Sequence, residues 1–347
     1  RPRPDLGELE EATRVLRAAN KPVIIAGGGV HYSLAEAELA HFASTHSIPV
    51  VETVAGKSSL LADHPNYAGP LGVTGAAAAN AVVSQADVVI AVGTRLEDFT
   101  TGSWTLFHND AQFIGVNAAR FDAIKHRAVP VVGDARETLT EWDAVLGEWA
   151  AAPSWMTEVQ QHRKDLASFV DSRTRDDGQW PPSYAQLVGL VNDAATPDDY
   201  VLTAAGGLPG ELNINWMSKA VASFDCEYGF SCMGYEISGA WGAAMARRTG
   251  DVFSLVGDGS YLMMNSDIYA SVLSGHKMIL VVCDNEGYAV IERLQTNQGG
   301  ASYNNMLADS NGTGTDSRVD FAAHAQALGA LTHEVHSLDE FSNALQA

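Results

Sequence analysis

Short apolar runs rich in β-branched residues alternate along this chain with segments of helical periodicity. In the first half the runs are PVIIAGGG, IPVVETV, ADVVIAVGT, QFIGVNA and AVPVVGD. Continuous apolar strands separated by helices indicate a parallel sheet that is covered on both faces. A second series of the same kind runs from YAQLVGLVNDA to KMILVVCDN. The chain therefore predicts an α/β fold class with two doubly wound parallel-sheet domains.

The two series are separated by a stretch of different character. WMTEVQQHRKDLASFVDSRT is predicted to be a polar helix, and RDDGQWPPS breaks regular structure with an Asp-Gly pair and paired prolines. We place the first domain at residues 1–150, a linker at 151–180 and the second domain at 181–347. The opening segment, RPRPDLGELEEATRVLRAANKP, predicts an extended stretch followed by an amphipathic helix.

Composition excludes several classes of partner. The 347 residues include 42 acidic and 21 basic side chains, for a formal charge of -21. Such a field repels phosphate backbones and anionic membranes, so we expect no nucleic acid and no membrane partner, although the acidic excess can also serve solubility alone. The three cysteines, Cys226, Cys232 and Cys283, form no CxxC pair. They indicate neither a disulfide framework nor structural zinc, and they favour a reducing, cytoplasmic location.

Polar residues follow two consecutive strands of the second series. GDGS (257–260) ends one strand, and DNEGY (284–288) ends the next. A right-handed crossover makes such strands parallel and often adjacent, and ligands bind outside their carboxyl ends. The carboxylate of Asp258 and the amide oxygen of Asn285 would then lie close together. Hard oxygen donors of this kind suit Mg²⁺ bound with a diphosphate, but a lone Gly-Asp-Gly is more often a turn that only ends a strand.

The residues around these turns support the same interpretation. Gly257 and Gly259 allow the backbone to approach a ligand, and Gly287 allows a turn whose carbonyl can face a metal. Between the strands we expect a helix with Asn265 or Ser266 at its cap. Ile268 and Val272 should form one apolar face of that helix.

Taken together, the two polar turns resemble the signature of thiamine diphosphate-dependent enzymes. The resemblance implies a middle domain in the first half, a diphosphate- and Mg²⁺-binding domain in the second, and thiamine diphosphate and Mg²⁺ as cofactors. It also implies that Asp258, Asn285 and the backbone of Gly287 hold the metal. Asp284 departs from the family's usual Asn-Asn pair, but the ligand in the family is the second member of that pair.

Two more stretches match this family. TAAGGLPGE (203–211) offers flexible backbone amides for diphosphate oxygens, although an ordinary loop is the alternative. EYGFSCMGYEISGAWGA (227–243) resembles the segment around the centre of the cofactor. There Met233 would bend the cofactor and the backbone of Cys232 would meet its aminopyrimidine, with core packing as the alternative for the methionine. The residues so implied in cofactor binding are Gly206, Gly207, Leu208, Cys232, Met233, Gly257, Asp258, Gly259, Ser260, Asn285, Gly287 and Tyr288.

Other chemistries fit the sequence less well. The glycine cluster GGGVHYS, from Gly27, has Tyr32 where a dinucleotide fingerprint needs its third glycine, so a working NAD site is not expected. His31 is expected to be structural rather than a ligand. The residues around Ser231, GFSCMG, lack the spacing of a serine hydrolase elbow.

Within the family, AAGGLPGELNINW, EYGFSCMGYEISGA, GDGSYLMMNSDIYAS, CDNEGYAVIERLQ and GGASYNN look like the member that hydrolyses a cyclic dione in inositol catabolism. That resemblance implies cleavage of a ring carbon-carbon bond to an open-chain deoxy-uronic acid. Proton-transfer candidates are Glu236, Glu286, Tyr288 and Glu292, each of which is more simply explained as a solvated side chain. Acetolactate synthases share the scaffold but usually have Gly-Ala-Met-Gly at 231–234. An acetolactate synthase or 2-oxoacid decarboxylase, or a non-catalytic protein of this fold, remains the alternative.

The family also implies parts that this sequence does not show. Its activating glutamate is carried by a pyrimidine-binding domain that precedes the middle domain and comes from a partner subunit. The last βα pattern here stops before its expected closing strand. We therefore expect these 347 residues to be part of a longer polypeptide, with catalytic residues outside them, that forms a homodimer or homotetramer with shared active sites.

Overall fold

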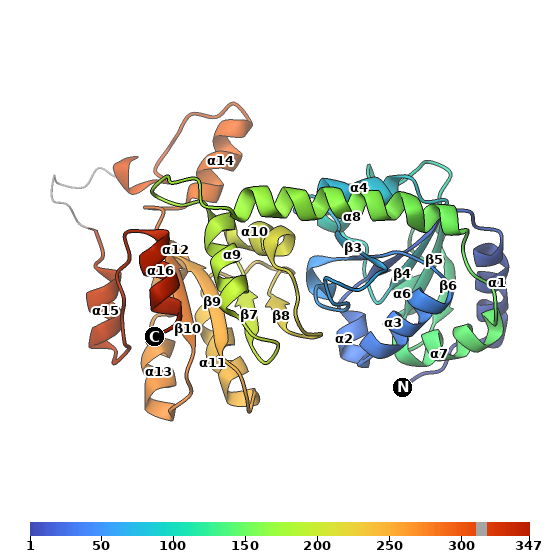
Figure 1. The fold of residues 1–347 in the computed structure, drawn as a ribbon, viewed down its shortest axis with the longest axis horizontal. Helices are drawn as coiled ribbons and strands as arrows, with labels where there is room; N and C mark the ends of the chain where they lie inside the picture. The colour runs from blue at the N-terminus through green and yellow to red at the C-terminus, as the bar shows by residue number, and fades with distance from the viewer. Residues whose placement is uncertain (310–317) are drawn as a thin grey trace. The chain divides into compact units, whose positions relative to one another are not determined.

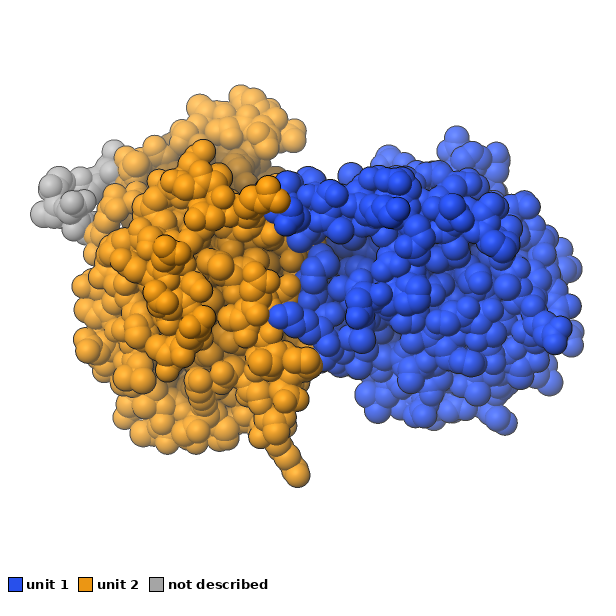
Figure 2. Space-filling model, in the orientation of Figure 1, with its two compact units in different colours: residues 1–172, 217–222 blue, residues 173–216, 223–347 orange. Residues whose placement is uncertain are grey.

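The computed structural model describes residues 1–309 and 318–347. Two compact units are distinguished in Figure 2: unit 1 comprises Arg1–Ser172 and Met217–Ala222, and unit 2 comprises Arg173–Trp216 and Ser223–Ala347. In the described residues each unit contains its own parallel sheet (Figure 1). The predicted α/β class with two parallel-sheet domains is therefore confirmed.

Unit 1 is built on a six-stranded sheet in the order β3-β2-β1-β4-β5-β6, with every pair parallel. The strands are β1 (Pro22–Ala26), β2 (Val50–Glu52), β3 (Tyr67–Pro70), β4 (Val88–Val92), β5 (Gln112–Asn117) and β6 (Val129–Val132). The helices are α1 (Leu6–Arg17), α2 (Gly29–Ser33), α3 (Glu36–Thr45), η1 (Val54–Gly56), α4 (Ala77–Ser84), α5 (Asp98–Thr101), α6 (Arg120–Ala123), η2 (Lys125–Arg127), α7 (Ala135–Leu146) and α8 (Pro153–Thr174).

Both faces of this sheet are buried, which explains why its strands show no polar alternation. Ile24 of β1 packs in one apolar cluster, with residues of α1, α3 and α7, while Ile25 packs in another, with residues of α4 and α8. Successive side chains of a strand point to opposite faces, so this division places helices on both sides. Most of the predicted linker 151–180 is helix α8, whose Trp155 and Val159 are buried in the second cluster.

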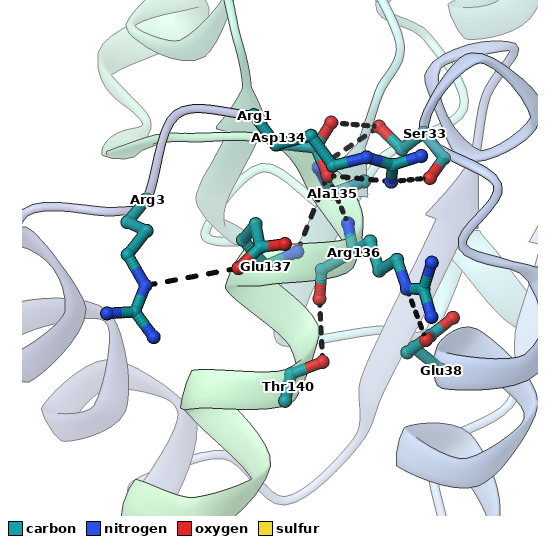
Figure 3. Close-up of polar contacts among 9 residues, drawn as sticks. All are labelled: Arg1, Arg3, Ser33, Glu38, Asp134, Ala135, Arg136, Glu137 and Thr140. Atoms are coloured by element: carbon teal, nitrogen blue, oxygen red, sulfur yellow. Dashed lines mark hydrogen bonds and ion pairs between the residues drawn. The ribbon is translucent and has the colours of Figure 1, made fainter.

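The extended opening segment is fixed to unit 1 by polar contacts around the start of α7, drawn in Figure 3. Asp134 is the N-cap of α7, and its carboxylate accepts from the amides of Arg136 and Glu137 at 3.0 and 3.4 Å. The same carboxylate accepts from the Ser33 hydroxyl at 3.0 Å and pairs with the Arg1 guanidinium at 3.4 Å. One side chain thus caps a helix and holds two distant segments.

The glycine cluster at the end of β1 is explained by backbone packing. The amide of Gly29 donates to the carbonyl of Gly93 at 2.9 Å, and a Cβ added to Gly29 would lie 2.5 Å from the Gly93 Cα. The strand order is that of a dinucleotide-binding sheet, in which the crevice between β1 and β4 receives the ligand. Here the glycines bring two backbones into contact at that crevice.

Unit 2 contains a four-stranded parallel sheet in the order β10-β9-β7-β8 within its described residues. The strands are β7 (Tyr200–Thr203), β8 (Phe224–Cys226), β9 (Val252–Gly257) and β10 (Ile279–Cys283). The helices are α9 (Tyr184–Ala194), α10 (Leu208–Asn215), α11 (Tyr235–Ala246), α12 (Asp258–Met264), α13 (Ser266–Ser274), α14 (Ala289–Asn297), η3 (Leu307–Asp309), α15 (Phe321–Ala327) and α16 (Leu338–Leu345).

The predicted unit β9–helix–β10 is present, with β9 and β10 as parallel neighbours. Two details differ from expectation. Asn265 is the N-cap of α13, but its side chain makes no capping bond and donates to the Leu262 carbonyl instead. Ile268 is buried, whereas Val272 is 45% exposed, so the apolar face is narrower than predicted. No helix in the described ranges is both long and apolar enough to cross a membrane.

Candidate functional site

The two polar turns meet at one edge of the unit 2 sheet. Val282 pairs with Val256 and Cys283 with Gly257 in the β9–β10 register, so both strands end at the same level. Asp258 is the first residue of α12 and follows β9 directly, and Asn285 lies two residues beyond β10. Adjacent parallel strands therefore bring Asp258 and Asn285 together, as the sequence predicts.

Asp258 and Asn285 each leave one oxygen without a partner. The Asp258 Oδ2 accepts from the Gly287 amide at 2.8 Å, and the Asn285 Nδ2 donates to the Tyr184 hydroxyl at 2.6 Å. The Oδ1 atoms of both residues are buried and have no hydrogen-bond partner among the described residues. Such orphaned atoms cost about 1–3 kcal/mol each. Two hard oxygens in this condition at one sheet edge are suited to hold a divalent cation such as Mg²⁺.

The charge environment of Asp258 agrees with this. Burial raises the pKa of Asp258, and the nearby Asp284 carboxylate raises it further, while the backbone amides of Gly259 and Gly287 oppose the rise. A bound cation would lower the pKa of Asp258 instead, because it favours the ionised carboxylate. Within residues 1–309 and 318–347, no three His, Cys, Asp or Glu residues group as a metal centre. The mixed set of one carboxylate, one amide oxygen and a backbone group is thus the candidate.

The turn that carries Gly287 is shaped by a segment distant in sequence. Gly287 has φ +147°, and a Cβ there would lie 2.4 Å from the Asn305 carbonyl oxygen. The Tyr288 amide donates to that carbonyl at 2.8 Å, and the Leu307 amide donates to the Glu286 carbonyl at 2.8 Å. Glycine is therefore required at 287 for close backbone packing.

The predicted diphosphate loop connects β7 to α10. Gly206 has φ +80°, Gly207 is the N-cap of α10, and Leu208 begins that helix and is buried. A Cβ at Gly207 would lie 2.9 Å from Nη2 of Arg293 and 3.2 Å from the Tyr184 ring. A helix N-terminus beside a guanidinium favours an anion.

Tyr184 and Arg293 were not found by sequence reasoning. Tyr184 opens α9, and Arg293 lies in α14 within the stretch CDNEGYAVIERLQ, but the sequence assigns neither of them a role. Only the fold brings them to the loop. Burial raises the pKa of the Tyr184 hydroxyl, so it stays protonated as the partner of Asn285.

The side chains of two other predicted residues, Met233 and Tyr288, approach the backbone of Gly259. A Cβ added to Gly259 would lie 2.7 Å from Cε1 of Tyr288 and 3.3 Å from Cε of Met233. Gly259 therefore leaves room for both side chains. The backbone of Cys232 is engaged locally, since its amide donates to the Glu227 carboxylate at 2.6 Å and its carbonyl accepts from the Tyr235 amide at 3.2 Å.

Of the four proton-transfer candidates, Glu236 is the one for which the expectation of a solvated side chain is wrong. Glu236 is fully buried, and burial raises its pKa against the lowering effect of donors that include Ala205, Gly234 and Ser260. Glu286 pairs with Arg318 at 2.5 Å, and Glu292 accepts from the Asn305 amide group at 3.1 Å. Tyr288 is 45% exposed.

His31 and Ser231, to which the sequence assigns no catalytic or ligand role, make local structural contacts. His31 Nδ1 contacts Glu36 Oε1 at 2.8 Å, and Nε2 contacts the Lys57 carbonyl at 3.0 Å. The Ser231 hydroxyl donates to the Ala204 carbonyl at 3.3 Å, which binds the 227–236 segment to the loop after β7. Both interpretations from sequence agree with these contacts.

Comparison with known proteins identifies both halves of the chain. A family model described as thiamine pyrophosphate enzyme, central domain, matches residues 9–142. A second, described as thiamine pyrophosphate enzyme, C-terminal TPP binding domain, matches residues 210–347. The first match lies in unit 1, and the second begins within α10 and covers the candidate metal turns.

Curated relatives align along almost the whole chain. Proteins named 3D-(3,5/4)-trihydroxycyclohexane-1,2-dione hydrolase from Bacillus thuringiensis (strain Al Hakam) and Bacillus cereus (strain AH820) are 34% and 35% identical to it, across 99% of this chain. The chain spans 58% of the length of these relatives. With both matched domains, the chain belongs to the thiamine pyrophosphate enzyme family.

Proposed function

We propose that this chain is the central and cofactor-binding part of a 3D-(3,5/4)-trihydroxycyclohexane-1,2-dione hydrolase that uses thiamine diphosphate and Mg²⁺. The activity would be hydrolytic cleavage of a ring carbon-carbon bond of the cyclic dione to 5-deoxy-glucuronate in myo-inositol degradation. The observation that carries the proposal is the 34–35% identity to relatives of that name across 99% of the chain. The candidate site supports it with the residues that such a cofactor needs.

Thiamine diphosphate, when bound, supplies a carbon nucleophile and an electron sink for breaking a bond next to a carbonyl. The residues of this chain would hold and orient it. Asp258, Asn285 and the backbone at Gly287 would hold Mg²⁺, and the amides of Gly206, Gly207 and Leu208 would bind the diphosphate. Their support is the pair of orphaned oxygens and the start of α10 at Gly207, beside Arg293.

The packing at Gly259 supports a second part of this assignment. Met233 and Tyr288 both lie over Gly259, next to the metal turns. Met233 would support the centre of the cofactor there, beside the backbone of Cys232. Gly257 and Ser260 complete the proposed cofactor-binding set, since they flank Asp258 and Gly259 in the same turn.

The substrate assay separates the two enzymatic alternatives. The full-length polypeptide, loaded with thiamine diphosphate and Mg²⁺, should turn over the cyclic dione and leave pyruvate unchanged. Consumption of pyruvate without consumption of the dione would instead identify an acetolactate synthase or decarboxylase. Turnover of neither, with tight cofactor binding, would identify a non-catalytic member of the family.

We also infer the assembly and the compartment. A homodimer or homotetramer with shared sites is proposed because the family implies it, and light scattering of the full-length polypeptide tests it. Cys226, Cys232 and Cys283 are all unpaired in the structure, which supports a reducing, cytoplasmic location.

A further inference from the structure

The buried carboxylate of Glu236 joins three segments that are separate in the sequence. Its Oε1 accepts from the Ala205 amide at 3.0 Å, and its Oε2 accepts from the Gly234 amide at 2.8 Å. The Ser260 hydroxyl hydrogen-bonds to the same carboxylate. Glu236 itself is 0% exposed. A buried carboxylate is tolerated only when such donors replace its water, so these three bonds fix its position.

The three partners belong to the three parts of the proposed cofactor site. Ala205 precedes the diphosphate-loop glycines Gly206 and Gly207, Gly234 follows Met233, and Ser260 follows the metal turn at Asp258. Each partner lies next to a residue that would contact the cofactor. Movement of one loop relative to another would therefore break a hydrogen bond to Glu236.

Further bonds hold the same segments in the same register. The Glu227 amide donates to the Thr203 carbonyl at 3.3 Å, and the Ser231 hydroxyl donates to the Ala204 carbonyl at 3.3 Å. The Glu236 carbonyl accepts from the Ser254 hydroxyl of β9 at 2.8 Å, which ties α11 to the sheet. Of these contacts, the carboxylate of Glu236 is the one that joins all three cofactor segments.

We propose that Glu236 is a positioning residue for the thiamine diphosphate site, which aligns the diphosphate loop, the Met233 segment and the metal turn before the cofactor binds. The inference rests on the proposed function. It replaces the idea that Glu236 moves a proton in the reaction, because both carboxylate oxygens are occupied by donors and the side chain is sealed from solvent. Preorganisation of this kind lowers the cost of binding.

Asp199 offers a matched control in the same unit. It is 8% exposed, and its carboxylate accepts from the amides of Thr196 and Asp251 at 2.6 Å each. It lies just before β7, at the opposite end of the strand from the diphosphate loop. Asp199→Asn and Glu236→Gln thus disturb the same kind of buried carboxylate, but only Glu236 touches the cofactor segments.

The experiment uses the full-length polypeptide and its Glu236→Gln and Asp199→Asn variants. Melting temperature is measured without cofactor, and thiamine diphosphate is then titrated in the presence of Mg²⁺ with tryptophan fluorescence as the readout. We expect both variants to lose thermal stability. Glu236→Gln should also weaken cofactor binding by at least about tenfold, whereas Asp199→Asn should stay within about twofold of the parent. Both variants lose hydrogen bonds to a charged carboxylate, but only those of Glu236 hold the cofactor segments.

Equal affinity of the Glu236→Gln variant and the parent would overturn the inference, and so would equal weakening in both variants. If the parent itself binds no thiamine diphosphate, the proposed function fails. If the parent binds it and the Glu236→Gln variant binds it equally well, only the inference about Glu236 fails. Hydrogen exchange of the cofactor-free parent keeps the test decisive if the variants do not fold. The amides of Ala205 and Gly234 should be protected, and rapid exchange of either would overturn the proposed alignment.

Discussion

At the scale of single residues, the proposed metal site has a buried carboxylate as a ligand and an exposed carboxylate near it. Asp258 is buried with an orphaned oxygen, and Asp284 is exposed at the end of β10. Asp258→Ala should weaken Mg²⁺-dependent binding of thiamine diphosphate by about 100-fold, because a ligand is removed. Asp284→Asn is the matched control and should leave the affinity within about threefold of the parent. Calorimetric titration of both variants measures this, and the assignment is wrong if Asp284→Asn has the larger effect.

A second residue-scale prediction concerns the pH dependence of stability. Glu52 is fully buried at the end of β2, where burial raises its pKa from 4.5 to about 6 against the opposing charge of Lys57. A raised folded-state pKa gives stability that is present below about pH 4.5 and is lost as the pH rises through about 6. The loss is on the order of 2 kcal/mol.

Glu52→Gln should not show that loss. Burial lowers the pKa of Lys57 to about 8, so Lys57 keeps its charge throughout this interval and does not disturb the comparison. Denaturant unfolding of parent and variant is measured near pH 4.5 and near pH 7. The free energy of unfolding of the variant, relative to that of the parent, should be about 2 kcal/mol higher at pH 7 than at pH 4.5. A constant difference would mean that Glu52 does not titrate in this range.

At the scale of elements, the start of α7 is held more strongly than an ordinary helix end. Asp134 caps α7 and also binds Ser33 and Arg1 (Figure 3), whereas Asp5 caps α1 through the amides of Gly7 and Glu8. Asp134→Ala should destabilise the protein by about 2–3 kcal/mol and Asp5→Ala by about 1 kcal/mol. Urea unfolding curves compare them. Equal losses would show that the contacts beyond the cap contribute nothing.

Elements were also the scale at which the sequence was most informative. Apolar runs such as VVIAV of β4 are typical of strands that are buried on both faces of a sheet. For this reason β1, β4 and β9 could be predicted from the sequence. Asn265 is the N-cap of α13, as predicted, but its side chain makes no capping bond because Asn265 has helical φ and ψ and directs its amide to the preceding turn. Capping depends on backbone geometry that the sequence does not specify.

At the scale of the whole molecule, the two units have separate cores, and the proposed cofactor residues all belong to unit 2. Thiamine diphosphate with Mg²⁺ should therefore slow hydrogen exchange in β7, β9 and β10 more than in β1 and β4, because a ligand stabilises the part that it binds. Exchange measured by mass spectrometry, with Asp258→Ala as the control that lacks the effect, tests this. Equal protection of both sheets would contradict it.

By itself, the sequence determined the α/β class, the adjacency of the turns at Asp258 and Asn285, and the family. Those conclusions depend on local patterns, because strand burial and turn residues are encoded in short stretches. Only the tertiary structure decided that Tyr184 orients Asn285, that Asn305 shapes the turn at Gly287 and that Glu236 is buried among three loops. These contacts join residues far apart in the chain, and their geometry is set by packing rather than by any neighbouring residue.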